Sequence, residues 1–404
     1  MKQSVLILFI LTLLSACTPS RIVYRLLPDT KDYKKFPTYN IPPAQHPFRY
    51  QEKDVKEIFW EDLFSTPQYQ FKRVFRKTKT NALMVFHADT LIYEKYRRGY
   101  SKDKIQTVFS ISKSVVTLLL MNSLMNNKLE SLDEPVTRYI PWMPDSVYGG
   151  ITLNHLLNMQ SGLTLKSMKP FDLKDGPGVF YYGADIVESL QKLMTVEYEP
   201  GTVFKYRDIN VQLLLFVLEK VEQKTFISLF NELIWEKIGA ENKALWIADR
   251  SKDKVPYVFS GLSCAPIDLA KIGSILLNQG YACNGQVCSK KLLDSLSNVS
   301  DLNPQLFQKW LWWHSVETKI LSDSLICNKE QGTHYFVWSE VPAMDIFAEG
   351  FRGQFIYLYP PKQLMIIRTG EQYDYFNPLF RNARKRTFKW PKYMLEACKK
   401  YPNI

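Results

Sequence analysis

The sequence lacks the motifs by which many hydrolases and nucleotide-binding enzymes are recognised. It has no G-x-S-x-G, no H-E-x-x-H and no phosphate-binding loop, and its five histidines make no obvious catalytic triad. Its six cysteines show no paired C-x-x-C spacing, which would suggest zinc. Internal repeats are not apparent. We therefore expect no metal or cofactor, and a serine or similar nucleophile would need a base other than histidine.

The sequence also has no long hydrophobic run near its start. The apolar run from Val5 to Leu14 is too short to span a bilayer. Lys2 precedes the run and Leu14-Ser15-Ala16-Cys17 follows it, a pattern that resembles the bacterial lipoprotein signal. By that resemblance residues 1–16 are removed, and Cys17 becomes the lipidated first residue of a cell-envelope protein. The alternatives are an ordinary cleaved signal peptide and an uncleaved anchor, and each leaves the catalytic part outside the cytoplasm.

Basic residues exceed acidic ones. The chain has 52 Lys and Arg against 40 Asp and Glu, a net charge of +12. Part of the excess lies at Lys31, Lys34 and Lys35, and more lies between residues 381 and 400. Because the export signal argues against a nucleic-acid partner, we interpret these clusters as solvated faces near an anionic membrane or cell wall.

The apolar pattern changes along the chain. Residues 17–50 are rich in Pro and Lys with little periodicity, which predicts an extended tether. Residues 82–86 and 91–96 flank a short connection and predict a hairpin. Further strands are expected near the C-terminus, at residues 336–338, 346–348, 355–359 and 364–368.

Residues 131–296, in contrast, are mostly helical in pattern. We therefore predict one domain over residues 51–404 with an α+β fold. Its sheet would be assembled from about residues 80–130 and 330–400, with helices around it and the helical segment inserted between.

Four S-x-x-K pairs occur, beginning at Ser101, Ser110, Ser189 and Ser251. Only Ser110 is followed by a long apolar run that would bury a helix and seat the pair at its N-terminus. Residues three apart share a helix face, so Ser110 can be the nucleophile and Lys113 its proton acceptor. A partly desolvated position near a helix N-terminus would lower the pKa of Lys113, and the Ser110 N–H could bind an oxyanion.

A third polar group is expected to handle the leaving-group proton. The strongest candidate is Tyr206, which follows a turn at Pro200-Gly201 and precedes an apolar helix. The alternative for any of the 23 tyrosines is simple packing. Elsewhere, Cys283 and Cys288 bracket an Asn-Gly turn, so a disulfide between them and a pair of free thiols are both open.

Six segments, in order, resemble the penicillin-binding-protein-like serine hydrolases of the class C β-lactamase type. The family includes β-lactamases, carboxylesterases, D-amino-acid peptidases and linear-amide hydrolases. The matching segments are Phe109–Ser114, Leu132–Pro141, Ile151–Leu163, Phe204–Asn210, Ser260–Gly273 and Gly350–Gln354. The resemblance covers roughly residues 80–370 and implies an acyl-serine mechanism.

The resemblance also implies roles for single residues. Ser110 would be acylated, Lys113 would take its proton and Tyr206 would pass a proton to the leaving group. The oxyanion would be bound by the N–H groups of Ser110 and Phe351, and water would release the acyl group. In the family the segment that contains His155, Ser161 and Gly162 is scaffold.

This chain departs from the β-lactamase pattern at two motifs. Asp208 stands where the pattern has Asn, and its carboxylate near Lys113 would favour the ammonium and shift the role of base towards Tyr206. Alternatively Asp208 turns away and Asn210 makes the polar contact. Ala348-Glu349-Gly350 replaces the Lys-Thr-Gly of the antibiotic-directed members, so a lysine for a substrate carboxylate is missing.

These departures favour esters or linear amides over β-lactams as substrates. The leading hypothesis is a lipid-anchored extracytoplasmic serine hydrolase that acts on a small-molecule or peptide acyl substrate. The alternative is a catalytically silent binding or sensory lipoprotein on the same fold. A transacylase would use the same residues.

Overall fold

The computed structural model describes most of the chain. The described residues are 28–53, 57–65, 70–166, 181–298, 308–314, 316–320, 326–328, 333–335, 338–342, 344–371 and 390–402. The expected signal segment and Cys17 lie outside them. No helix in these ranges is long and apolar enough to cross a membrane.

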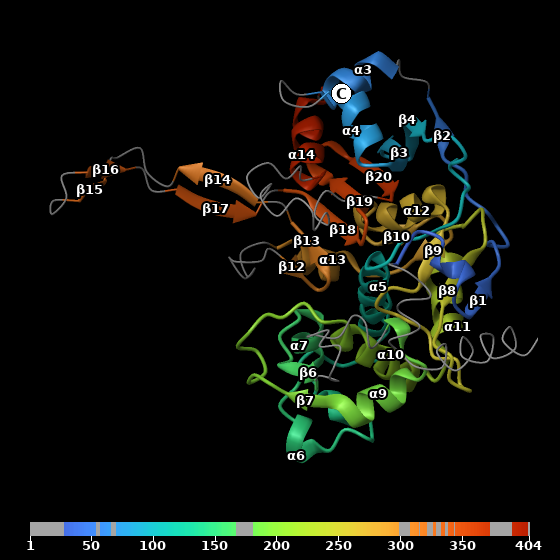
Figure 1. Ribbon diagram of the computed structural model, residues 1–404, viewed down its shortest axis with the longest axis vertical. Coiled ribbons are helices and arrows are strands. Elements are labelled where there is room, and N and C mark those ends of the chain that lie inside the picture. The colour runs from blue at the N-terminus through green and yellow to red at the C-terminus, as the bar shows by residue number, and fades with distance from the viewer. Residues whose placement is uncertain are drawn as a thin grey trace, which may run out of the picture.

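The main sheet joins strands from the two ends of the chain, as the sequence predicts. Its eight strands run β12 (Gln308–Lys309), β13 (Trp312–Trp313), β18 (Ile346–Gly350), β19 (Gln354–Tyr359), β20 (Leu364–Gly370), β3 (Thr80–His87), β4 (Thr90–Tyr96) and β2 (Gln51–Glu52). β20 pairs with β3 in the middle of the sheet (Figure 1). All pairs are antiparallel except β2 with β4. The α+β prediction is confirmed.

Both faces of this sheet are covered, because consecutive side chains of the central strands β3, β19 and β20 are buried and point alternately to the two faces. Leu83 and Val85 of β3 pack with α3 (Glu57–Leu63), α4 (Phe71–Lys77) and α14 (Trp390–Lys400). Met84 and Phe86 belong to the larger core on the other face. That core contains α5 (Ile111–Met125) and α12 (Pro266–Leu277).

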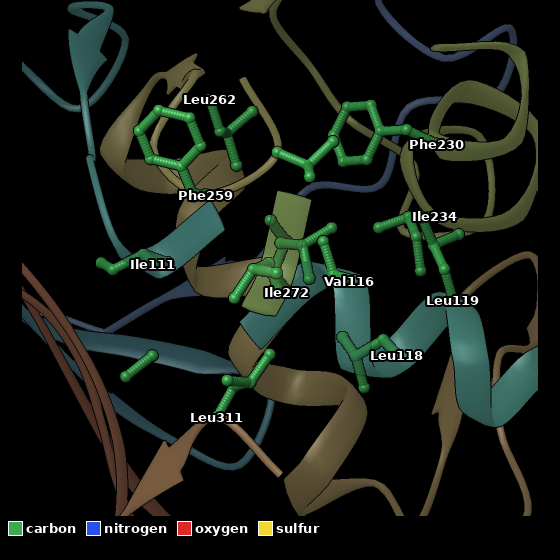
Figure 2. Packing of buried hydrophobic residues seen from close by; sticks show 14 of the residues in the cluster. Ile111, Val116, Leu118, Leu119, Phe230, Ile234, Phe259, Leu262, Ile272 and Leu311 are labelled. Atoms are coloured by element: carbon green, nitrogen blue, oxygen red, sulfur yellow. The ribbon is translucent and has the colours of Figure 1, made fainter. Parts of the chain in front are cut away.

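The long helix α5 runs through the larger core. Figure 2 shows Val116, Leu118 and Leu119 of α5 near Ile234 and Ile272. Every residue from Ile111 to Ser123 is buried, so the helix has no solvent-facing side over this range. This helix is the one that the apolar run after Ser110 predicts.

A second, smaller sheet corrects the expectation of a tether. β1 (Thr38–Ile41) pairs with β8 (Ala244–Ile247), β8 pairs with β9 (Leu262–Cys264), and β9 pairs with β5 (Gln106–Thr107). Phe36, Ile41 and Tyr50 are buried in the main core. The prediction of an extended tether is therefore wrong for residues 28–50, which contribute a strand and core side chains. Their prolines obscured this in the sequence.

The segment between the two halves of the main sheet is helical, with additional strands that the sequence did not reveal. Its helices are η2 (Val136–Arg138), α6 (Asp145–Tyr148), α7 (Leu153–Leu157), α9 (Ile186–Leu193), α10 (Asp208–Glu222), α11 (Phe226–Phe230), the π-helical turn η3 (Asn231–Trp235), α12 and α13 (Lys290–Ser297). β8 and β9 belong to the second sheet, and β6 (Leu163–Leu165) pairs with β7 (Met194–Val196). These strands are short, which is why period-2 alternation does not mark them.

Shorter elements complete the chain. The single turns η1 (Asp32–Lys34) and η4 (Pro360–Lys362) and the hairpin β10 (Tyr281–Ala282) with β11 (Gly285–Gln286) connect larger elements. Two further hairpins project from the body in Figure 1, β14 (Val316–Ile320) with β17 (Trp338–Pro342) and β15 (Ile326–Asn328) with β16 (Thr333–Tyr335). Of the strand predicted at 336–338, Trp338 opens β17, and residues 336 and 337 lie outside the described residues.

Candidate active site

The turn that presents Ser110 is strained and tightly held. Phe109, the residue before it, has a φ of +50°, a left-handed conformation that is uncommon for a bulky residue. The Ser112 hydroxyl holds the turn from one side, donating to the Phe109 carbonyl at 2.7 Å and accepting from the Leu262 N–H at 3.0 Å. The Val108 N–H donates to the Leu262 carbonyl at 2.9 Å. The second sheet, through β9, therefore positions the start of α5.

Lys113 and Ser110 are in direct contact, as the S-x-x-K spacing predicts. Lys113 Nζ lies 2.8 Å from Ser110 Oγ. It also donates to the carbonyl of Phe259 at 2.7 Å and lies 2.8 Å from Asp208 Oδ1. The Lys113 side chain is only 2% exposed. An ammonium group has three N–H donors, and each here has a partner.

The charge state of Lys113 differs from the prediction. Burial opposes the charged form, but the Asp208 carboxylate and the Tyr206 side chain together raise the pKa of Lys113 above its usual value of 10.5. The expected lowering of this pKa is therefore wrong, because the Asp208 carboxylate and the Tyr206 side chain together outweigh desolvation. Lys113 is an ammonium that is paired with Asp208 at neutral pH.

Tyr206 and Asp208 come from the N-terminal end of α10. Asp208 is the first helical residue, and Tyr206 lies in the loop before it. The Tyr206 ring centroid is 5.1 Å from Lys113 Nζ, within the range of a cation–π contact. The sequence left open whether Asp208 or Asn210 meets Lys113, and the structure places Asp208 there.

Asn210 has a different role. It is buried, and its Oδ1 accepts the Ser161 hydroxyl, while its Nδ2 donates to the Arg207 carbonyl at 3.3 Å. The alternative in which Asp208 turns away and Asn210, predicted as a possible substrate-binding residue, makes the polar contact at the site is therefore wrong. The hydrogen bond between Asn210 and Ser161 connects α10 to the turn after α7. Gly162 is required in that turn because a Cβ would clash with the Tyr198 carbonyl.

The end of β18 closes another side of the site. A Cβ at Gly350 would clash with the Val108 carbonyl oxygen, so glycine lets this strand approach the nucleophile turn closely. The ring of Phe351, the next residue, meets the ring of Phe109 edge to face at 5.6 Å. Phe351, which follows the last residue of β18, therefore lies beside the turn that carries Ser110. This is the arrangement expected for the two oxyanion donors.

The β12–β13 hairpin contributes a residue that the sequence analysis did not single out. Trp313 lies 5.8 Å from Tyr206 between ring centroids. The hairpin turn has φ values of +47° at Trp310 and +66° at Leu311, a conformation that glycine and asparagine usually supply. Hydroxyls from α5 hold the turn, because Ser114 donates to the Leu311 carbonyl at 2.8 Å and Thr117 to the Trp310 carbonyl at 2.6 Å.

The carbonyl of Phe259 was also missed by sequence reasoning. A backbone acceptor has no signature in residue type, so only the fold could reveal it. The position of Trp313 likewise depends on strand pairing between β13 and β18. A signal for Trp313 was present in the run Trp310-Leu311-Trp312-Trp313, which has three tryptophans in four residues.

Two other S-x-x-K serines have different partners. The Ser189 hydroxyl donates to the Asp185 carbonyl at 2.7 Å, and Lys192 pairs with Glu188. The Ser251 hydroxyl donates to Asp249 at 2.7 Å, and Lys254 reaches the Thr38 carbonyl at 2.9 Å. The third alternative, Ser101, lies exposed in the loop between β4 and β5. The choice of Ser110 by helix context agrees with the Ser–Lys contact in the structure.

Cys283 and Cys288 are free thiols, so the disulfide alternative is wrong. Cys283 is in the turn between β10 and β11, where its Sγ lies 3.4 Å from the Lys237 carbonyl. Cys288 follows β11 and packs against Gly280 at the other end of the hairpin. The two cysteines are at opposite ends of the paired strands.

Fold and site together define a class. Residues 71–271, about half of the chain, match the beta-lactamase family model. The chain thus belongs to the β-lactamase-related serine hydrolase family, which confirms the resemblance drawn from the six segments. This matched range includes Ser110, Lys113, Tyr206 and Asp208 and ends before β18.

A particular relative is the 6-aminohexanoate-dimer hydrolase of Paenarthrobacter ureafaciens. It is 25% identical to this chain over 244 residues, which cover 58% of this chain and 61% of the relative. The match thus spans less than two thirds of the relative's length.

Solved structures confirm the fold. A Bacillus anthracis protein, provisionally described as a 6-aminohexanoate-dimer hydrolase, has a TM-score of 0.65 at 20% identity, covering 83% of this chain and 85% of that one. A class C β-lactamase from Rhodobacter sphaeroides has a TM-score of 0.52 at 18% identity, covering 81% of this chain and 97% of that one.

Proposed function

We propose that this chain is an extracytoplasmic, lipid-anchored serine hydrolase that cleaves an ester or linear amide through an acyl-Ser110 intermediate. The observation that carries the chemistry is the contact of 2.8 Å between Lys113 Nζ and Ser110 Oγ inside a network with Tyr206 and Asp208. The location rests on the signal that ends at Cys17, which is a sequence prediction.

The charge on Lys113 decides which group acts as base. Because Asp208 holds the proton on Lys113, we assign the Tyr206 oxygen, and not the Lys113 amine, as the acceptor of the Ser110 proton. The nearby ammonium stabilises negative charge on that oxygen. Lys113 thus acts as an electrostatic partner rather than as the proton acceptor.

In the acylation step, Tyr206 carries one proton from Ser110 to the leaving group. Ser110 Oγ attacks the substrate carbonyl carbon while its proton moves to the Tyr206 oxygen, and the carbonyl oxygen becomes an oxyanion. The Ser110 and Phe351 N–H groups are the proposed oxyanion donors. When the carbon–nitrogen or carbon–oxygen bond breaks, Tyr206 gives the proton to the leaving group and an ester of Ser110 remains.

Deacylation reverses the roles. A water molecule gives a proton to the Tyr206 oxygen as its own oxygen attacks the acyl carbon. Tyr206 then returns the proton to Ser110 Oγ as the ester bond breaks, and the carboxylic acid product leaves. A transacylase would differ only in using another acceptor in place of water.

The Ala348-Glu349-Gly350 motif supports esters or linear amides as the substrate class. Ala348 of β18 stands where antibiotic-directed members have a lysine, and its side chain is fully buried. It offers no charge to a substrate carboxylate. The 25% identical relative is named for hydrolysis of the 6-aminohexanoate dimer, which supports a linear amide. We therefore expect p-nitrophenyl esters or linear amides to be cleaved far faster than nitrocefin, and efficient nitrocefin turnover would contradict this substrate class.

A fluorophosphonate probe tests the nucleophile directly. We expect the probe to label the wild-type chain at Ser110 and to leave Ser110→Ala unlabelled. Ser101→Ala is the matched control, because Ser101 begins an exposed S-x-x-K pair in a loop, and its labelling should remain at the wild-type level. A folded wild-type chain that fails to react would instead support the silent binding or sensory module.

A further inference from the structure

A second cavity lies away from the acylation centre, between two segments that are far apart in the sequence. It has a volume of about 300 Å³ and is bounded by the segment that contains η1 and by the loop between β4 and β5. Four of its lining residues are basic: Lys31, Lys34, Arg98 and Lys104. None of its lining residues is acidic.

The four basic side chains are exposed. Within the described part of the chain, none of them forms a salt bridge. Of the acidic residues nearby, Asp29 and Asp32 lie 2.6 and 2.8 Å from Lys35, Glu371 lies 2.6 Å from Arg97, and Asp103 accepts from Asn242 Nδ2 at 3.5 Å. The cavity therefore combines concavity with an excess of positive charge.

This chemistry suits a phosphate group. Arginine and lysine are the side chains that bind phosphate oxygens, arginine through its planar fork and lysine as a point charge. The cavity also has room for a phosphate together with the glycerol unit attached to it. A neutral or cationic ligand would gain nothing from four unpaired cations.

The position of the cavity along the chain indicates where such a phosphate comes from. Lys31 follows the predicted lipidation site Cys17 by 14 residues (31 − 17), a span of at most about 50 Å when fully extended. At the point where the described chain begins, the Pro28 carbonyl accepts from Arg352 Nε at 2.6 Å. The chain thus enters the folded body next to the cavity, within reach of the bilayer that would hold the lipid.

We propose that this cavity binds the phosphate of an anionic phospholipid headgroup, and that it docks the folded body onto the membrane. A lipid chain on Cys17 would hold the protein within reach, while the four cations would fix which face meets the bilayer. The proposal rests on the export signal and on the charge of the cavity. It does not depend on the chemistry at Ser110.

Vesicle sedimentation with the non-lipidated Cys17→Ser chain tests the proposal without help from the anchor. We expect binding to phosphatidylcholine vesicles that contain phosphatidylglycerol, no binding to phosphatidylcholine alone, and weaker binding as salt is raised. The variant Lys31→Gln/Lys34→Gln/Arg98→Gln/Lys104→Gln should bind at least about 100-fold more weakly, since each basic residue near an anionic surface contributes roughly fivefold.

A matched variant separates a site from general attraction. Arg73→Gln/Lys77→Gln/Lys243→Gln/Lys291→Gln removes the same charge from exposed positions elsewhere and should retain most of the binding. Thermal unfolding of both variants checks that the fold is intact.

Three outcomes would overturn the proposal. The first is an equal loss of vesicle binding in the two quadruple variants. The second is no binding of the parent chain to anionic vesicles. The third is that calorimetry shows binding of inorganic phosphate to a parent chain that does not bind vesicles. The last outcome would identify a soluble phosphate compound as the ligand.

Discussion

At the scale of single residues, the pair Lys113 and Asp208 decides the character of the site. The carboxylate lies 2.8 Å from Nζ and raises the pKa of Lys113 despite its burial. Because this folded-state pKa lies above the unfolded value, the ion pair stabilises the fold below pH 10.5, and that contribution is lost as the pH rises through the folded-state pKa. The same pairing is the reason why we propose Tyr206 as the acceptor of the Ser110 proton.

Asp208→Asn separates the two possible bases. Without the carboxylate, burial lowers the pKa of Lys113, so the basic limb of the pH profile of kcat/KM, at which the ammonium is lost, should move to lower pH. We expect the plateau rate to fall about tenfold or more, because the ammonium that supports the Tyr206 oxygen is then lost. A higher plateau rate would identify Lys113 as the base. Asp253→Asn, in an exposed loop, is the control and should leave both quantities unchanged.

At the scale of elements, the site is held by close contacts between backbones. Val108 and Ser112 form hydrogen bonds that join the start of α5 to β9. The end of β18 packs against the same turn at Gly350. The contact depends on the missing Cβ rather than on conformational freedom, because Gly350 has no left-handed φ. A small change in strand position would therefore move the Phe351 N–H relative to Ser110.

Gly350→Ala tests this packing. The added methyl would press on the Val108 carbonyl, which is backbone and cannot move aside easily. We expect kcat for the ester to fall about 100-fold through a displaced oxyanion donor, with a loss of stability of about 1–3 kcal/mol. Gly150→Ala is the matched control, since a Cβ there meets nothing within 4 Å. Unchanged kcat in Gly350→Ala would show that Phe351 does not bind the oxyanion.

At the scale of the whole molecule, the N-terminal segment is part of the catalytic framework. β1 completes the sheet in which β9 and β5 lead to the nucleophile turn, and Phe36 and Ile41 fill the core beside it. The order β1-β8-β9-β5 connects residues near position 40 to Ser110 through strands near positions 245 and 263.

Two truncations distinguish this role from that of a tether. A chain that starts at residue 28 should unfold at the same temperature as the chain that starts at residue 18. A chain that starts at residue 51 loses β1 and several buried side chains, each worth about 1.5–3 kcal/mol, against a total stability of about 5–15 kcal/mol. We expect that chain to show no cooperative unfolding and no turnover. Retention of both would restore the tether interpretation.

Much of the fold followed from local patterns. The hairpin β3–β4, the strands β18 to β20 and the helix after Ser110 were predicted because their apolar periodicity is strong. The strands β1, β8 and β9 escaped prediction, since each is short and is stabilised by partners far away in the chain. The same reason explains the missed carbonyl of Phe259 and the ring of Trp313.

The sequence by itself determined the class of chemistry, because Ser110 and Lys113 are three residues apart on one helix and their contact is local. It also determined the α+β fold, through the apolar strands at the two ends of the chain. Only the tertiary structure decided that Asp208 rather than Asn210 reaches Lys113, that the pKa of Lys113 rises, and that Cys283 and Cys288 stay apart. Those outcomes depend on distances between separate elements, and the pKa of Lys113 depends on the balance between burial and the nearby Asp208 and Tyr206 side chains.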